Sequence, residues 1–527
     1  MISYITTAIP YVNARPHLGH GLELVQTDVL ARHRRLRGYQ VSFLTGTDDN
    51  AAKNVSAAAA AGVEVADFVA TNGDAFIRLA ERLGSSHDDV IRTGTDPRHR
   101  PAVTKLWQAI SADLYRRDYT GGYCAGCEQF YRVEDLVDGL CPEHRIAPHQ
   151  VTEQNWFFAL SRYQQRIEEL ITSNTVSVQP AHRRAEVLSF VRSGLADFSV
   201  SRPSSRSAGW GVPVPGDESQ TVYVWADALI NYISAAGYGV DQDRYRSRWC
   251  AADERLHVIG KGISRFHAVY WLGLLLAAGE PLPTRISIHE YLQTGGRKIS
   301  KSGSPRPSDP AIVSDPDDLL TRYGRDAVRW WLVSDVTPVG DTDFSEERLK
   351  SRYTEDLANT VGNLINRTVA LAQRGLGGEV RIGPPDAVAR PVPPGLQRAA
   401  DLAAALPERI DVALDDFNHR QATARIIEVA AAANAAIEAT RPWQHVRPAV
   451  DGDPVAREQL RTILAALLQV CRRVAVELTA FVPDGAARLL GVLGDPVAAT
   501  ETLRLGPAEP AFPRLAPTSD RVPSSGR

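Results

Sequence analysis

The sequence predicts an α/β fold in which a doubly wound parallel sheet is interrupted by an insertion and followed by an α-helical bundle. Near the start, two strand-like runs flank a helical stretch, which is the pattern of a βαβ unit. Strand-like runs return only after residue 220, and Ala/Leu-rich sequence with helical spacing dominates beyond residue 355. A sheet that the chain leaves and later re-enters must contain an insertion.

Composition places few limits on function. The 527-residue chain is too long for one domain of usual size, and its 44% hydrophobic and 23% charged residues are ordinary for a globular protein. A net charge of −3 does not indicate nucleic-acid binding, although a local basic face stays compatible with it. No apolar run is long enough to span a membrane and no signal peptide begins the chain. Three clustered and two isolated cysteines favour a reducing, cytoplasmic location.

The first βαβ unit carries a candidate phosphate site. Its strands are expected at residues 2–7 and 40–45, with a helix from about residue 20 to residue 37. His17-Leu18-Gly19-His20 stands where the helix begins. A glycine between two histidines lets a helix N-terminus approach a triphosphate, and the histidines can donate to its oxygens. His17, Gly19 and His20 are therefore predicted to contact a triphosphate.

A second phosphate-binding element is expected far downstream, at Arg297-Lys298-Ile299-Ser300-Lys301-Ser302. A flexible loop with two lysines, Lys298 and Lys301, can close over the same phosphates. Together the two elements suit an enzyme that stabilises charge at the α-phosphate while pyrophosphate leaves. Taken singly, each has an ordinary explanation as a surface turn or a solvated loop.

The turn-rich insertion contains a predicted zinc site. Cys124-Ala-Gly-Cys127 is followed after thirteen residues by Cys141-Pro-Glu-His144. A C-x2-C hairpin facing a C-x2-H turn provides four ligands for tetrahedral zinc, and because protein fills all four positions the metal would be structural. The alternatives are a redox CxxC pair, disfavoured by the absence of a thioredoxin-like frame, and a remnant without metal.

The rest of the chain completes the fold. Further strands are expected at residues 221–225, 256–259 and 285–288. Residues 355–375 and 396–490 have helical spacing, which predicts the bundle, and a Gly/Pro-rich connector lies between them. Proline-rich residues 506–527 are predicted to be disordered.

The two phosphate elements, in this order, resemble the HIGH and KMSKS signatures of class I aminoacyl-tRNA synthetases. Longer runs narrow the resemblance to the methionyl-tRNA synthetases, and they follow one another from residue 2 to about residue 450. These runs are Ile9-Pro10-Tyr11-Val12-Asn13, Gly46-Thr47-Asp48, Ser201-Arg202-Pro203, Trp210-Gly211-Val212-Pro213, the segment 223–232, Gly260-Lys261, Arg265-Phe266-His267, Tyr323-Gly324, Asp343-Phe344-Ser345 and Asn363 with Arg367.

The resemblance implies a Rossmann-like, HUP-type catalytic sheet with a zinc-knuckle connective domain, and it sets domain boundaries. The two halves of the catalytic domain would be residues 1–115 and 221–304, on either side of a connective insertion at 116–220. A linking region at 305–354, an anticodon-binding helical domain at 355–505 and the tail at 506–527 would follow.

The resemblance also implies a reaction, partners and residue roles. L-methionine and ATP with Mg²⁺ would form methionyl-adenylate, the methionyl group would pass to tRNA(Met), and the protein would act as a monomer. The amino-acid pocket would consist of Ile9, Tyr11, Asp48 (for the ammonium), Trp225, Ala228, Leu229, Tyr232, Ile263 and His267. ATP would contact His17, Gly19, His20, Gly260, Lys298 and Lys301, and the anticodon would contact Asn363, Arg367 and Trp443.

Several positions depart from the family pattern near the expected active site. Asn50-Ala51 replaces a His-Gly pair, Gly262 replaces an aspartate, and Gly303-Ser304-Pro305 follows the mobile loop in place of Leu-Gly-Asn. These changes leave two alternatives open: a divergent paralogue that activates methionine or an analogue for a specialised pathway, and a catalytically weak tRNA-binding protein. A small nucleotidyltransferase is disfavoured by the helical bundle and the zinc insertion. Ile299 replaces the signature's methionine in a chain whose only methionine is Met1.

Overall fold

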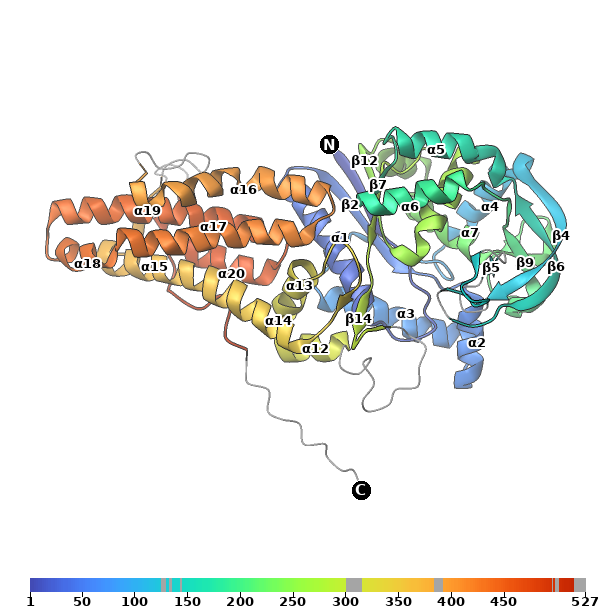
Figure 1. Ribbon diagram of the computed structural model, residues 1–527, viewed down its shortest axis with the longest axis horizontal. Coiled ribbons are helices and arrows are strands. Elements are labelled where there is room, and N and C mark those ends of the chain that lie inside the picture. The colour runs from blue at the N-terminus through green and yellow to red at the C-terminus, as the bar shows by residue number, and fades with distance from the viewer. Residues whose placement is uncertain are drawn as a thin grey trace, which may run out of the picture. The chain divides into compact units, whose positions relative to one another are not determined.

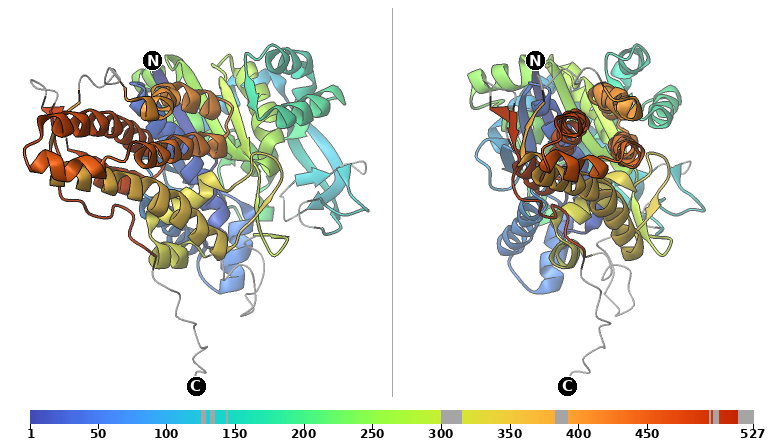
Figure 2. Two further views of the ribbon diagram at one scale, coloured as in Figure 1. Left: turned by 60° about the vertical axis from the view of Figure 1, so that its left-hand side comes forward. Right: turned by 90° about the vertical axis from the view of Figure 1, so that its left-hand side faces the viewer.

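A computed structural model describes residues 1–124, 129–131, 135–142, 145–299, 315–382, 392–494, 496–497 and 502–515. The chain divides into two compact units (Figures 1 and 2). The first comprises Met1–Asp317 with Thr337–Asp343, and the second comprises Asp318–Val336 with Phe344–Arg527. Within the described ranges, no helix is long and apolar enough to cross a membrane. The finer domain boundaries expected from the sequence stay predictions.

A six-stranded parallel sheet forms the centre of the first unit, in the order β3-β2-β1-β12-β13-β7. Its strands are β1 (Ile2–Thr7), β2 (Gln40–Thr47), β3 (Asp89–Arg92), β7 (Ser177–Gln179), β12 (Glu254–Gly260) and β13 (Arg285–His289). The chain builds outward on one side of β1 and later returns on the other, so the predicted doubly wound sheet with an insertion is confirmed. The switch point lies between β1 and β12, where ligands bind at the carboxyl ends of strands.

Helices accompany this sheet, and the chain order follows the expected βαβ pattern. They are α1 (Leu18–Leu36), α2 (Ala52–Ala61), α3 (Val65–Arg82), α4 (His99–Ala109), α7 (Val224–Leu229), α8 (Asn231–Ala236), α9 (Gln242–Tyr245) and α10 (Trp271–Ala278). One large hydrophobic cluster joins strand residues such as Leu44 and Ile286 to helix residues such as Leu106 and Leu272. This continuous core holds rigidly the loops that leave the sheet at its carboxyl edge.

An antiparallel sheet in the order β5-β4-β6-β8 forms the main part of the insertion (Figure 1). Its strands are β4 (Leu114–Cys124), β5 (Gln129–Tyr131), β6 (His149–Phe158) and β8 (Phe198–Ser199), and helices α5 (Gln164–Thr172) and α6 (Ala181–Arg192) lie between β6 and β8 in the chain. Between α5 and α6, however, β7 pairs in parallel with β13 at the edge of the central sheet. The insertion is therefore tied to the sheet that it interrupts.

The strand expected at residues 221–225 is mostly wrong. β11 (Asp217–Val222) ends before it, and α7 begins at Val224. β11 also belongs to a separate antiparallel sheet with β9 (Ser201–Pro203) and β10 (Pro213–Val214). The run Tyr223-Val224-Trp225 has strong strand propensity. It nevertheless forms the start of a helix, because its side chains pack against the core in that conformation.

A short sheet in the first unit carries the start of the predicted mobile loop. β14 (Leu292–Thr294) pairs antiparallel with β15 (Arg297–Lys298) and in parallel with β16 (Thr342–Asp343). The loop beyond Ile299 lies outside the described residues. The hairpin therefore fixes where that loop leaves the folded part of the unit.

The second unit is mainly helical, as predicted. Its helices are α12 (Pro316–Tyr323, beginning in the first unit), α13 (Arg325–Ser334), α14 (Glu346–Arg352), α15 (Asn363–Leu376), α16 (Gln397–Asp415), α17 (His419–Thr440), α18 (Trp443–Val450), α19 (Pro454–Leu478) and α20 (Pro483–Leu493). Figure 1 shows the long helices α16, α17 and α19 lying side by side, and the right-hand view of Figure 2 looks nearly along them. Their alanine-rich facing positions are buried, which allows close helix packing.

A small sheet and a packed segment complete the second unit. β17 (Glu379–Arg381), β19 (Thr502–Arg504) and β18 (Pro496–Val497) form the sheet in that order. Phe512, in the segment expected to be disordered, is 3% exposed and meets the ring of Tyr353. Residues 516–527 of that segment lie outside the described part of the chain.

Candidate active site

The N-terminus of α1 lies just beyond the carboxyl end of β1, and two histidines shape it. His17 Nδ1 accepts a hydrogen bond from the backbone amide of Gly19 (3.1 Å), and His20 Nδ1 accepts one from the backbone amide of His17 (3.0 Å). Because Nδ1 is the acceptor in both neutral rings, the ring hydrogen is assigned to Nε2. Each histidine therefore offers an Nε2–H donor of the kind that a phosphate oxygen accepts.

Gly19 is required by this arrangement for a reason that the sequence did not reveal. A Cβ atom added at Gly19 would lie 2.9 Å from Cε1 of His17, inside van der Waals contact. The sequence-based argument assigned the glycine to close approach by phosphate. The structure adds that the glycine makes room for the capping ring, so a side chain there would displace His17.

The predicted amino-acid pocket is brought together by α7, α8 and the loop after β1. The rings of Tyr11 and Trp225 are 5.9 Å apart, and Trp225 stacks on Phe266 with centroids 3.9 Å apart. Of the predicted pocket residues, Leu229 and Tyr232 belong to the large hydrophobic cluster of the first unit. Ile9, Trp225 and Ile263 are partly buried and pack against that cluster. Ala228, on the same helix as Trp225, is buried.

Tyr232 and His267 form a buried polar pair in this pocket. His267 Nδ1 lies 2.9 Å from the carbonyl oxygen of Ile263, so it donates there, and its Nε2 accepts from the Tyr232 hydroxyl at 2.7 Å. Burial lowers the pKa of His267 to about 4 and raises that of Tyr232 well above its usual value. Both side chains are thus neutral at physiological pH, which suits a pocket for an apolar side chain.

The departure at Asn50 is accommodated by a buried hydrogen-bond network. The backbone amide of Asn50 donates to Asp48 Oδ1 (3.2 Å), and its side-chain amide donates to Asp227 Oδ2 (2.8 Å). Asp227 Oδ1 in turn lies 3.0 Å from His99 Nε2, and both side chains are buried. Asp48, the predicted ammonium ligand, is 1% exposed. Its backbone pairs with that of Tyr11 in an isolated parallel β-bridge. Asn50 therefore joins the Asp48 loop to α7, which carries Trp225.

Gly262, which stands where the family has an aspartate, lies next to Tyr291. The backbone amide of Gly262 donates to the hydroxyl of Tyr291 (2.8 Å). Lys261, beside it, pairs with Asp341 and lies 3.3 Å from Glu290, which is 1% exposed. Gly260, a predicted ATP contact, ends β12 at the switch point. The described residue that meets the backbone of Gly262 is thus a tyrosine and not a carboxylate.

Only one of the two lysines predicted to close over phosphate lies within the described residues. The backbone of Lys298 belongs to β15, and the backbone amide of Ile299 donates to the carbonyl of Leu292 (3.1 Å). Ile299 is 6% exposed. Lys301 lies outside the described residues. Ile299 thus supplies an apolar anchor at the base of the loop.

Two of the four predicted zinc ligands can be located. Cys124, at the end of β4, and Cys141 are buried in one small cluster with Tyr131. Cys127 and His144 lie outside the described residues, and the described residues hold no group of three or more metal-binding side chains. Both located cysteines belong to the same small cluster, which is compatible with a shared metal.

The predicted anticodon residues lie on two helices of the second unit that pack together. Asn363 and Arg367 are one turn apart near the start of α15, and Trp443 begins α18. Arg367 donates a hydrogen bond to Glu438 (2.6 Å). Glu438 lies close to the end of α17, five positions before Trp443. Trp443 is 41% exposed, which is unusual for a tryptophan and leaves a ring face open to a partner.

One candidate residue was missed by the sequence-based reasoning. Arg202 is 7% exposed, and its guanidinium lies 3.9 Å from the ring centroid of Tyr223. Its Nη1 donates to Ser199 Oγ and to the carbonyl of Ser201 (both 2.7 Å), whereas its Nε has no hydrogen-bond partner among the described residues. Among the described residues no carboxylate pairs with it. A buried cation without a counter-ion is costly and points to an anionic ligand. Its place in Ser201-Arg202-Pro203 is the only signal in the sequence.

Comparisons with known proteins agree with this geometry. The family model of the class I tRNA synthetases (M) matches residues 3–150 and 145–369. The methionine–tRNA ligase of Brucella suis biovar 1 (strain 1330) is 39% identical over 503 residues, covering 94% of this chain and 92% of the relative. That of Streptomyces coelicolor is 36% identical over 506 residues, covering 93% and 89%.

Solved structures give the same result at the level of the fold. Mycobacterium tuberculosis methionyl-tRNA synthetase bound by methionyl-adenylate superposes with a TM-score of 0.87 at 34% identity, covering 97% of this chain and 100% of that one. The free form of the same enzyme gives 0.81 at 33% identity, covering 98% of each chain. With a His-x-Gly-His motif at the start of α1, aromatic rings packed around Trp225 and this similarity along almost its whole length, the chain belongs to the methionyl-tRNA synthetases of class I.

Proposed function

We propose that this protein is a methionine–tRNA ligase. It uses ATP with Mg²⁺ to activate L-methionine: the methionine carboxylate attacks the α-phosphate, pyrophosphate leaves and methionyl-adenylate forms. A hydroxyl of the terminal ribose of tRNA(Met) then takes the methionyl group and AMP is released. The observation that carries the proposal is the α1 N-terminus with its two Nε2–H donors, placed at the sheet's switch point beside a neutral aromatic pocket.

The proposed chemistry is mainly electrostatic. His17 and His20 donate to phosphate oxygens where charge develops, and Lys298 and Lys301 approach from the mobile loop. Such preorganised donors stabilise the transition state without transferring a proton. Asp48 holds the substrate ammonium through a charge-assisted hydrogen bond. Gly19 and Gly260 let the nucleotide come close to the backbone.

Methionine selectivity follows from the neutral pocket. Tyr11 and Trp225 supply aromatic faces for the thioether. The hydrogen of Tyr232 Oη is engaged by His267 Nε2, so this pair presents no charge to the substrate side chain. A charged side chain would lose its hydration there without gaining a counter-ion.

The anticodon of tRNA(Met) is proposed to meet α15 and α18. Trp443 would stack on an unpaired base, while Asn363 and Arg367 would read base edges. The exposure of Trp443 supports this assignment, because a ring that served only helix packing would be buried. The cysteine chemistry and this RNA partner together favour a cytoplasmic location.

A structural zinc ion is proposed at Cys124, Cys127, Cys141 and His144. Cys124 and Cys141 share one small buried cluster, and together with Cys127 and His144 they would supply the four ligands of a tetrahedral zinc ion. Purified protein should carry about one zinc per chain by elemental analysis. Cys124→Ser should release the metal and destabilise the insertion, whereas the control Cys250→Ser, at an exposed cysteine, should retain it. A folded, fully active wild-type protein without zinc would contradict the assignment.

Amino-acid-dependent exchange of pyrophosphate into ATP tests the proposed activity. The twenty amino acids, homocysteine, norleucine and selenomethionine should be compared, followed by charging of tRNA(Met). Exchange with methionine above all others, followed by charging, is the expected result. Preference for another amino acid, or exchange without charging, would favour the divergent paralogue. Binding of tRNA(Met) without exchange would favour the catalytically weak binder suggested by Gly262.

A further inference from the structure

A buried carboxylate outside the proposed substrate sites joins three segments of the first unit. Glu290 directly follows β13 and precedes β14, and its side chain is 1% exposed. It accepts hydrogen bonds from Arg183 and lies 3.0 Å from Nε2 of His182, both near the start of α6 in the insertion. Nζ of Lys261, in the turn after β12, lies 3.3 Å from its carboxylate. Glu290 therefore ties the insertion to the carboxyl ends of two strands of the central sheet.

Glu290 is ionised, and each of its two cationic partners has a second carboxylate. Although burial disfavours the charge, hydrogen bonds from Arg183 and His182 hold the pKa of Glu290 below its usual range. Arg183 also pairs with Glu186, and Lys261 also pairs with Asp341. The cost of burying a charge is offset only when such partners hold it in a fixed geometry, so this network is expected to be rigid.

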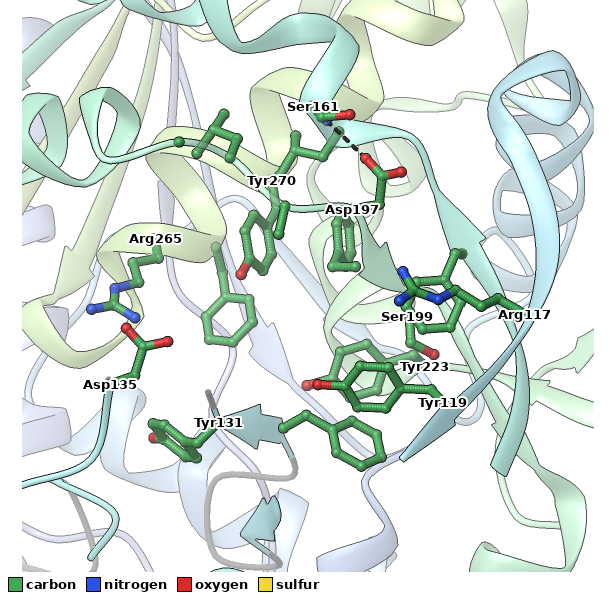
Figure 3. A pocket seen from close by; sticks show the side chains of 18 of the residues that line it. Arg117, Tyr119, Tyr131, Asp135, Ser161, Asp197, Ser199, Tyr223, Arg265 and Tyr270 are labelled. Carbon is green, nitrogen blue, oxygen red and sulfur yellow. Dashed lines mark hydrogen bonds between the residues drawn. The ribbon is translucent and has the colours of Figure 1, made fainter. Parts of the chain in front are cut away.

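The helix that holds Glu290 is itself attached at a second point. The ring of Phe190, on α6, lies against the guanidinium of Arg265, 4.4 Å from the ring centroid. Figure 3 shows Arg265 in the wall of a cavity of about 540 Å³, and Phe190 belongs to the same wall. Arg265 follows Lys261 by four positions in the segment after β12. Two attachments to one segment keep α6 from turning against it, which makes the helix a firm support.

From Lys261 the network continues to the hairpin that carries Lys298. Asp341, which pairs with Lys261, accepts from the backbone amide that follows Glu290 (3.0 Å) and from Nε2 of Gln293 (3.1 Å). Gln293 is the cross-strand partner of Lys298 in the β14–β15 pair. Glu290 and Asp341 thus hold the root of the hairpin from two sides, and the backbone of Lys298 is placed by these contacts.

We propose that Glu290 is a positioning residue for adenylate formation. Its contacts with α6 and Lys261 fix the root of the β14–β15 hairpin, so that Lys298 begins the phosphate-binding loop beside the carboxyl ends of the sheet. Gly262 leaves the turn after β12 without the family's aspartate, and Glu290 brings a carboxylate to this turn from the neighbouring strand. The inference rests on the proposed function, because it names what holds a lysine of that reaction in place.

Glu290→Gln tests the proposal, because it removes the charge and keeps nearly the same shape. The variant is expected to fold, since Arg183 keeps Glu186 and Lys261 keeps Asp341 as a partner. Glu186→Gln is the matched control, because it removes a carboxylate from the same arginine at a side chain that is 58% exposed. Adenylate formation is followed by pyrophosphate exchange, with kcat and the KM for methionine measured separately.

Both variants are also made in a Lys298→Ala background. Glu290→Gln alone should slow adenylate formation by roughly 10- to 100-fold, because a shift of about 1 Å in a contact to the reacting groups can cost that much. The KM for methionine should change little. When Lys298→Ala is already present, Glu290→Gln should slow the reaction by less than about 2-fold more, because the lysine through which it acts is gone. Glu186→Gln should leave the rate unchanged in both backgrounds.

Activation by Glu290→Gln at the wild-type rate would overturn the inference. An equal loss in both backgrounds would also overturn it, since Glu290 would then act without Lys298, and so would a rise in the KM for methionine that matches the loss of rate. If Glu290→Gln does not fold, Gln293→Ala takes its place with the same expected pattern, because it removes the contact of Asp341 with the strand opposite Lys298. A wild-type protein without methionine-dependent exchange would contradict the proposed function, and this inference with it.

Discussion

The proposed amino-acid pocket and the proposed anticodon face differ in how far their residues are buried. Tyr232 and His267 are 1% and 2% exposed and hydrogen-bonded to each other, whereas Trp443 is 41% exposed at the start of its helix. The pocket residues belong to the core of the first unit, and both ring nitrogens of His267 are hydrogen-bonded. The anticodon residues stand on the surface of a helical bundle whose own core is separate.

The difference reflects the size of the ligands. A small amino acid can be selected only if its surroundings are fixed and dry, so the pocket uses residues that also stabilise the fold. An anticodon loop is large and brings its own charge, so exposed side chains on rigid helices are sufficient. Changes in the pocket should therefore affect stability and activation together, while changes on the anticodon face should affect only tRNA.

The largest expected effect is on the chemical step. Lys301→Ala should lower the rate of adenylate formation by roughly 100- to 1,000-fold, because one preorganised contact to the transition state is lost. The dissociation constant for methionine should change little. Stopped-flow or pyrophosphate-exchange measurements at saturating methionine would show this, and activation at the wild-type rate would remove the loop from the proposed mechanism.

Acid should destabilise the pocket through His267. Its pKa is about 4 in the folded protein and near its usual value of 6.5 when unfolded, so between these values the unfolded chain binds more protons. This contribution to the free energy of unfolding is complete above pH 6.5 and falls as the pH drops toward 4, by roughly 3 kcal/mol for a shift of this size.

His267→Gln isolates this effect. The variant should show a shallower loss of stability between pH 6.5 and 4 in denaturant titrations, although His257, whose pKa burial lowers in the same direction, still contributes. Parallel curves for wild type and variant would show that His267 does not titrate as its burial implies. The pocket would then be less dry than its geometry indicates.

Trp443→Ala should separate the two regions directly. Loss of a base stack should cost roughly 1–3 kcal/mol in the binding of tRNA(Met) and a corresponding fall in kcat/KM for charging. Because Trp443 is exposed, stability and tRNA-independent pyrophosphate exchange should stay close to wild type. An equal loss in exchange and charging would make Trp443 a folding residue and break the comparison.

The smallest effect is expected at Ile299. Its buried side chain lies where the predicted mobile loop begins, and Ile299→Met preserves apolar bulk, so activation should stay within a few-fold of wild type. Ile299→Asn, which places a polar amide in the same buried position, provides the contrast and should lower activation more. Similar rates for both variants would show that the anchor is dispensable.

Local patterns in the sequence predicted much of the architecture. Strands at residues 2–7, 256–259 and 285–288 were predictable because buried parallel strands are short apolar runs. The helix after His17 and the long helices beyond residue 396 were predictable from apolar spacing. The strand predicted at Tyr223-Val224-Trp225 was wrong, because these residue types favour strands whereas their tertiary contacts place them at the start of a helix.

By itself, then, the sequence determined the fold class, the family and the positions where phosphate, methionine and tRNA are expected to bind, since these depend on residue types and their spacing. Only the tertiary structure decided how those residues support one another. The ring hydrogens of His17 and His20 were assigned by their backbone partners, and the neutrality of His267 by its burial. Asn50 gained Asp227 as a partner 177 positions away, and Arg202 emerged as a buried cation that pairs with no carboxylate in the described part of the chain. Such features depend on contacts between distant segments, and no local pattern encodes them.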